Sequence, residues 1–216
     1  MISIIIPAHN EENYIEDTIK AIKNQDFKEY EIIVVCDGCT DNTLEKVKQL
    51  ADKIIVLRSR KGPAVAKNEG AKRANKDILV FLDADTKISS GLLLDIKANI
   101  NNYAVGTAKI KPSNKIFKHR LMMSLKNNIL CRFGVSNGII FCSRKNFEKV
   151  NGFLEKNKGE DGSFIQNLKK EGKFYISKYP VINSTRRFDK KGYISVIFYW
   201  IKESFKKKDD PYEVVR

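Results

Sequence analysis

The sequence predicts an α/β fold built on a doubly wound, mostly parallel sheet. In the first half of the chain, four short apolar runs rich in β-branched residues alternate with helical stretches. Strands that are buried on both faces of a parallel sheet are continuously apolar, and helices connect them. The predicted strands are Ile2–Ile6, Ile32–Val35, Ile54–Leu57 and Ile78–Leu82.

The stretches between these strands have the character of helices. The first covers residues from about Glu11 to Asn24. The second begins within Thr40–Thr43, whose side chains suit a helix N-cap, and ends near Ala51. The third runs from about Pro63 to Ala74.

The second half of the chain is less regular. Lys115 to about Leu130 forms a basic, amphipathic stretch, and the other predicted helices are Arg144–Val150 and Glu160–Gly172. The predicted strands are Gly138–Cys142, Phe174–Ser177 and Val181–Asn183. No Pro/Gly linker separates the halves, so residues 1–110 and 111–216 are expected to share one compact domain.

The net charge of +14 lies entirely in the second half. Residues 1–110 carry 16 Lys+Arg and 16 Asp+Glu, whereas residues 111–216 carry 24 and 10. Such an excess indicates an anionic partner, which can be a phosphorylated substrate, an anionic lipid or a nucleic acid. The alternative is a solvated basic face with no partner.

The sequence has no segment of the roughly 20 apolar residues that cross a bilayer, and its start lacks the basic region of a secretory signal. Cys36-x-x-Cys39 matches half of a zinc or redox motif, but no second half follows, so reduced thiols are expected. The expected location is the cytoplasm, and at most the protein is peripheral on the inner face of the membrane.

Polar residues follow three of the predicted strands, at Pro7–Glu12, Asp37–Asp41 and Asp83–Asp85. In a doubly wound sheet, ligands bind beyond the carboxyl ends of the strands. Asp83 and Asp85 lie on the same side of an extended backbone, and two carboxylates so placed suit a hard divalent cation that also binds phosphate oxygens. The alternatives are a helix N-cap for Asp85 and a paired-carboxylate acid/base device.

Four successive segments resemble the motifs of family 2 glycosyltransferases in order and spacing, namely Ser3–Glu12, Val34–Thr43, Gly62–Ala71 and Phe81–Asp85. Further along the chain, a second set of residues resembles the acceptor half of that family, namely Gly138–Phe141, Arg144, Phe147, Gly152-Phe153 and Glu160-Asp161. The resemblance spans roughly residues 1 to 190. It implies a GT-A fold, with a donor-binding half at 1–110 and a smaller acceptor-side region at 111–216 that carries a basic C-terminal helix.

The resemblance also implies an activity: transfer of a sugar from a nucleotide diphosphate donor, expected to be a UDP-sugar, to an acceptor hydroxyl with inversion. The implied cofactor is Mn²⁺ or Mg²⁺, with Asp85 and Asp83 as its ligands. Asp161 would be the catalytic base, supported by Glu160. The implied nucleotide-sugar site consists of Pro7, Ala8, His9, Asn10, Glu11, Asp37, Lys67 and Asp83, with Asp37 on the base and Lys67 near the diphosphate.

The sequence departs from the family pattern in three places. His9 stands where Tyr or Phe is usual, and Cys39 replaces a common Ser. No Gln-x-x-Arg-Trp motif is present, which disfavours a processive polysaccharide synthase. Arg186 and Arg187 lie in that neighbourhood and would clamp the diphosphate, or form a basic surface pair.

Three other functions are alternatives to this one. A polyprenyl-phosphate sugar transferase needs no base, so Glu160 and Asp161 disfavour it, while the basic second half favours it. A nucleotidyltransferase would carry a Gly-rich loop after the first strand, and none is present. A nucleic-acid-binding module would need more aromatic residues among its cations, so no nucleic acid is expected as a partner.

One apolar segment, Tyr193–Ile201, is flanked by lysines on both sides. It is too short to cross a bilayer, but it suits a helix that lies among lipid headgroups. The alternative is a helix buried against the sheet. Together with the charge excess, this segment indicates a lipid-linked or otherwise anionic acceptor and contact with an anionic membrane surface.

Overall fold

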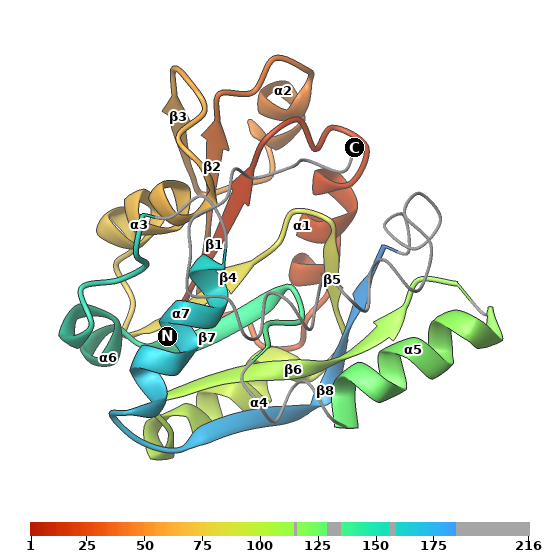
Figure 1. Ribbon diagram of the computed structural model, residues 1–216. Coiled ribbons are helices and arrows are strands. Elements are labelled where there is room, and N and C mark those ends of the chain that lie inside the picture. Colours follow the sequence, from red (N-terminus) through yellow and green to blue (C-terminus); the bar gives the residue numbers. More distant parts are fainter. Residues whose placement is uncertain (115, 129–134, 156–158, 185–216) are drawn as a thin grey trace.

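A single eight-stranded sheet organises the part of the chain that the structure describes, a computed structural model covering residues 1–114, 116–128, 135–155 and 159–184. The strand order is β3-β2-β1-β4-β7-β6-β8-β5 (Figure 1). The strands are β1 Ile2–Ala8, β2 Tyr30–Asp37, β3 Lys53–Leu57, β4 Ile78–Leu82, β5 Thr86–Ile88, β6 Val105–Pro112, β7 Ile139–Ser143 and β8 Phe174–Asn183. The helices are α1 Ile15–Lys23, α2 Thr43–Val47, α3 Pro63–Arg73, α4 Leu92–Asn99, α5 Phe117–Asn128, α6 Arg144–Lys149 and α7 Glu160–Lys169, with a 3₁₀ turn η1 at Ile100–Asn102.

The four strands predicted for the first half are confirmed. Strands β3, β2, β1 and β4 are neighbours in the sheet and all run parallel. Their carboxyl ends therefore meet at one edge. This arrangement brings the residues that follow β1, β2 and β4 to the same edge of the sheet.

The second half of the sheet mixes directions. Strand β7 is antiparallel to both β4 and β6, β6 is parallel to β8, and β5 closes the edge antiparallel to β8. Strands β5 and β6 and helix α4 were not predicted from the sequence. It was also wrong to split β8 in two: Ala108 pairs with Ser177 and Ile110 with Val181, so a bulge absorbs the residues around Pro180 without ending the strand.

Two apolar layers cover the sheet, one on each face (Figure 1). Side chains alternate along β1, so Ile4 and Ile6 join the layer formed with α1, α4 and α5, while Ile5 joins the layer formed with α3 and α7. In the second layer, the centroids of the Phe81 and Phe153 rings lie 4.8 Å apart. Burial on both faces is the reason that the parallel strands are continuously apolar in sequence.

Helix α1 begins at Ile15 and not near Glu11, because the loop before it is used in hydrogen bonding, whereas α2 begins at Thr43 as predicted but already ends at Val47. The N–H of Glu11 donates to Thr43 Oγ1 at 2.8 Å, and the N–H of Glu12 donates to Asp41 Oδ2 at 3.2 Å. These bonds join the β1–α1 loop to the β2–α2 loop at the carboxyl edge of the sheet. Among the described residues, no helix has the length and apolar character that a bilayer crossing requires.

Candidate active site

The β1–α1 and β2–α2 loops form one wall of the site. Asn10 has a left-handed φ of +55°, and its side chain bridges the loops: Nδ2 donates to Thr40 Oγ1 at 3.0 Å and Oδ1 accepts the Thr40 N–H at 2.8 Å. The ring Nδ1 of His9 lies 2.7 Å from the Asp37 carbonyl oxygen. This wall contains the residues predicted to contact the nucleotide, which are Pro7, Ala8, His9, Asn10 and Glu11.

Asp37 ties this wall to the start of α3. Its side chain is buried, and its two carboxylate oxygens accept the N–H groups of Lys61 at 2.6 Å and Gly62 at 2.8 Å. Gly38 follows with φ of +62°, and a Cβ there would lie 2.4 Å from the Arg60 backbone nitrogen. Each Asp37 oxygen keeps a further acceptor position, so its contact with a nucleotide base stays a prediction.

Lys67 is the centre of the site. It lies on α3 and is only 3% exposed. Its Nζ is 3.3 Å from Glu160 Oε1, donates a hydrogen bond to Asp161 Oδ1, and lies 5.1 Å from the centroid of the Phe153 ring. One ammonium thus joins the donor-side helix α3 to the first turn of α7.

Asp83 and Asp85 stand on the turn that follows β4. The Asp83 N–H donates to the Gly138 carbonyl at 2.9 Å, the Thr86 N–H donates to the Asp83 carbonyl at 3.1 Å, and Thr18 Oγ1 donates to the Ala84 carbonyl at 2.8 Å. The turn is therefore fixed by β7, by β5 and by α1. Both aspartate side chains are half-buried.

The electrostatics of the site are those of several carboxylates around one ammonium. Burial raises the pKa of Asp83 to about 7; Lys67 opposes this rise, whereas the Asp161, Asp85 and Glu160 carboxylates add to it. Burial also raises the pKa of Glu160, against the pull of Lys67. Burial lowers the pKa of Lys67, but the Asp161, Glu160 and Asp83 carboxylates outweigh it and the pKa is raised.

This donor set fits a divalent cation shared with a ligand. Within the described residues, no three His, Cys, Asp or Glu side chains are grouped as a closed metal cage. Mg²⁺ and Mn²⁺ in phosphate-handling enzymes are commonly bound by one or two carboxylates together with phosphate oxygens and water. That Asp85 and Asp83 form such a site stays a prediction, and the excess of carboxylates over the single Lys67 ammonium favours a cation there.

The raised pKa of Asp83 predicts a pH dependence of stability in metal-free protein. Because the folded state binds a proton more tightly than the unfolded state, the free energy of unfolding should fall as pH rises from 4 through about 7. In EDTA, we expect the wild type to lose roughly 1 kcal/mol or more between pH 5 and pH 8 relative to Asp83→Asn. Urea titrations of both proteins at each pH measure this; equal losses would contradict it.

The structure adds one residue that the sequence analysis did not single out. Asn68 Nδ2 donates to the Phe153 carbonyl at 2.9 Å, and Asn68 Oδ1 accepts the Phe153 N–H at 2.9 Å. Gly152, with φ of +71°, lies so close that a Cβ would be 2.7 Å from Asn68 Oδ1. The sequence did contain a signal for this contact, since Asn68 lies in the motif segment Gly62–Ala71 and Gly152-Phe153 is itself one of the family-like motifs. Arg186 and Arg187 lie outside the described residues.

Comparison with known proteins gives this site a class. The family model described as "Glycosyl transferase family 2" matches residues 3–147. Staphylococcus aureus TarS (residues 1–349), solved with UDP-GlcNAc, has the same fold with a TM-score of 0.67 at 22% identity, over 85% of this chain and 58% of that one. The mannosyltransferase PcManGT of Pyrobaculum calidifontis, solved with GDP-Man and Mn²⁺, gives 0.68 at 19% identity, over 97% and 65%. The fold and site define a transferase domain of the GT-A fold.

The chain belongs to glycosyl transferase family 2. One relative is the Campylobacter jejuni GalNAc(5)-diNAcBac-PP-undecaprenol beta-1,3-glucosyltransferase, 29% identical over 194 residues, which cover 82% of this chain and 62% of that protein. Another is the poly(ribitol-phosphate) beta-N-acetylglucosaminyltransferase TarS of S. aureus, 32% identical over 116 residues, or 50% of this chain and 20% of that protein. The chain thus spans less than two thirds of the length of these relatives.

Proposed function

We propose that the chain transfers a sugar from a nucleotide diphosphate donor, a UDP-sugar, to an acceptor hydroxyl with inversion at the anomeric carbon. One observation carries the proposal: Lys67 bonds Asp161 and Glu160 of α7 and acts electrostatically on Asp83, which shares the turn after β4 with Asp85. A candidate base and a candidate metal-binding pair therefore share one site. The solved complexes of TarS with UDP and UDP-GlcNAc support a uridine donor.

In this proposal, Asp161 is the base. The acceptor oxygen forms a bond to the anomeric carbon, its proton passes to the Asp161 carboxylate, and the bond to the diphosphate breaks with its electron pair on the leaving oxygen. The Asp161 side chain is 23% exposed and that of Lys67 only 4%, so Asp161 is open to an acceptor while Lys67 stays behind it. Lys67, which also bonds Glu160, holds the Asp161 carboxylate in position.

A divalent metal would be held by Asp85 and Asp83 together with the donor phosphates, and it would stabilise the charge of the leaving diphosphate. The Mn²⁺ in the structure of PcManGT supports this use of a metal. Lys67 contributes a fixed positive charge on the same side of the site. The first wall, formed by the residues from Pro7 to Glu11 with Asp37, would hold the nucleoside.

The acceptor we propose is a lipid-linked saccharide with a free hydroxyl. The C. jejuni relative, by its name, uses an undecaprenol-diphosphate-linked substrate, which supports this class. A polyprenyl phosphate is the second candidate, favoured by the basic second half of the chain, but it has no proton to lose and would leave Asp161 without a role. The proposed location is the cytoplasmic face of the membrane, contacted in part by Tyr193–Ile201, a segment outside the described residues.

The metal assignment is tested with Asp85→Asn, which removes a ligand charge and keeps the side-chain size. We expect UDP and UDP-sugars to raise the melting temperature of the wild type more with Mn²⁺ than with EDTA, because the metal would lower their Kd. A ligand at 100 times its Kd stabilises a protein by about 2.7 kcal/mol. In Asp85→Asn, Mn²⁺ should add little to that shift. Asp17→Asn, a surface change on α1, is the matched control. A wild-type response to Mn²⁺ in Asp85→Asn, or wild-type donor turnover, contradicts the assignment.

A further inference from the structure

Helix α5 is fixed to the sheet along one side. His119, Met123 and Lys126 are buried on that side. Asn127 bonds the β6 backbone at one residue in both directions: Nδ2 donates to the Ile110 carbonyl at 2.9 Å and Oδ1 accepts the Ile110 N–H at 2.8 Å. The helix therefore has a defined orientation, and its opposite side faces outward.

The outward side of α5 is apolar. Phe117, Leu121 and Leu125 are 73%, 51% and 44% exposed, and Ile116 just before the helix is 49% exposed. Phe117, Leu121 and Leu125 are spaced four residues apart and so form one stripe, about 12 Å long at the helical rise. Half of the eight large apolar side chains exposed in the described part of the chain lie within these ten residues. Scattered apolar residues are ordinary on a surface, but a contiguous stripe marks an interaction site.

The segment of sequence that contains this stripe carries positive charge and no negative charge. Residues 96–147 contain no Asp or Glu and ten Lys or Arg. Lys118 and Arg120 are exposed on α5 itself. Every charged side chain in this part of the sequence is thus cationic, and a partner for the stripe must accept apolar contacts and positive charge together.

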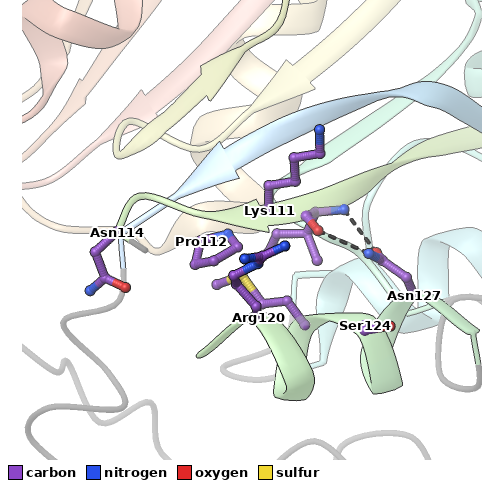
Figure 2. A pocket seen from close by; sticks show the side chains of 8 residues that line it. Lys111, Pro112, Asn114, Arg120, Ser124 and Asn127 are labelled. Carbon is purple, nitrogen blue, oxygen red and sulfur yellow. Dashed lines mark hydrogen bonds between the residues drawn. The ribbon is translucent and has the colours of Figure 1, made fainter. Parts of the chain in front are cut away.

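A pocket of about 440 Å³ lies between α5 and the end of β6 (Figure 2). Ile110, Pro112 and Met123 give it an apolar lining, while Arg120 and Asn127 give it polar groups. Figure 2 shows Arg120 extending from α5 towards the strand, and Lys111 extending from β6 away from α5. The guanidinium of Arg120 thus stands at a small apolar cavity, where it can pair with a phosphate group.

We propose that the stripe of Phe117, Leu121 and Leu125, with Lys118 and Arg120 beside it, docks on an anionic phospholipid bilayer. The apolar side chains would enter the headgroup boundary, and the cations would pair with lipid phosphates. A second copy of the chain is a poorer partner, because a symmetric contact through α5 would bring two cationic surfaces together. β6 ends at the same edge of the sheet as β4, since β7 runs antiparallel between them, so docking faces that edge towards a lipid-linked acceptor.

The role of this docking surface rests on the proposed lipid-linked acceptor, but vesicle binding is measured without any sugar transfer. The purified full-length chain is sedimented with vesicles of phosphatidylcholine alone or mixed with phosphatidylglycerol, at low and high salt. We expect the wild type to pellet only with the anionic vesicles and to be released by high salt. Leu121→Gln/Leu125→Gln and Lys118→Gln/Arg120→Gln should each raise the lipid concentration for half-binding about 10-fold or more.

The control is Val56→Thr/Leu94→Gln, which changes two apolar side chains that are 55% and 57% exposed elsewhere on the molecule. It should bind vesicles as the wild type does. Circular dichroism and the thermal shift with UDP show that every variant is folded. The proposal is overturned if the wild type stays in the supernatant, if the α5 variants pellet unchanged, or if binding is lost only when Phe198 and Trp200 are replaced by Ser. It is also overturned if the α5 variants abolish a dimer and leave vesicle binding intact.

Discussion

Asp161→Asn is expected to lower kcat about 10²-fold or more while donor affinity stays nearly unchanged. The change keeps the size of the side chain and removes only its capacity to take the acceptor proton, and a positioned base contributes about 10²–10⁴-fold. The measurement is steady-state turnover with a UDP-sugar and a lipid-linked saccharide, together with UDP binding by calorimetry. A loss of nucleotide affinity with unchanged kcat would place Asp161 outside the acceptor side of the site.

Glu160→Gln is the matched control for that experiment. It removes the other carboxylate that bonds the same Lys67 ammonium, so it disturbs the local charge balance to a similar degree. If Asp161 acts only by holding Lys67, the two variants should lose kcat equally. If Asp161 is the base, Asp161→Asn should lose much more than Glu160→Gln at a similar melting temperature.

Lys67→Met is expected to destabilise the metal-free protein by about 3–5 kcal/mol at pH 8. The variant leaves Glu160, which is 9% exposed, and the adjacent Asp161 and Asp83 without their cation, and breaking a buried ion pair by removing one partner typically costs this much. The loss should be smaller at pH 5, because carboxyls with a raised pKa take up protons as pH falls and the repulsion among them is relieved.

The control is Lys72→Met, on the same helix. Lys72 forms an ion pair with Glu69 at 2.6 Å, but its side chain is 66% exposed, so its removal should cost no more than about 0.5–1 kcal/mol. Urea unfolding of both variants in EDTA at pH 5 and pH 8 gives the comparison. A cost for Lys67→Met no larger than that for Lys72→Met at pH 8 would show that the Lys67 pairs carry no net stability.

Some elements of the fold could not be foreseen from sequence pattern. Strand β6 carries Lys109 and Lys111 on either side of the buried Ile110, because its end is exposed on one face, and so it lacks the continuously apolar run that identified β1 to β4. Strand β8 contains Pro180, which usually ends a strand, but the bulge opposite Lys109 accommodates it. In both cases the neighbouring strand, and not the local sequence, supplies the reason that the segment is extended.

The residues of the candidate site were expected individually, but not their contacts. Asp83, Asp85, Glu160 and Asp161 were singled out from their motifs, and Lys67 was expected near a diphosphate. The structure places Lys67 against Glu160 and Asp161 instead of leaving it facing outward. Its contact with a diphosphate stays a prediction, as do the roles of Asp37 and of the residues from Pro7 to Glu11.

The sequence by itself determined the parallel half of the sheet and the edge at which we expect its ligands to bind. Strands β1, β2 and β4 are buried on both faces and are followed by polar residues, whose place at this edge follows from the direction of the strands. The tertiary structure alone decided that α7 returns to α3 and that Lys67 meets Asp161, 94 residues further along the chain. Periodicity and capping report only on neighbours within a few residues. An ion pair at that separation forms when two helices, here α3 and α7, pack in the same layer on one face of the sheet, and no local pattern encodes it.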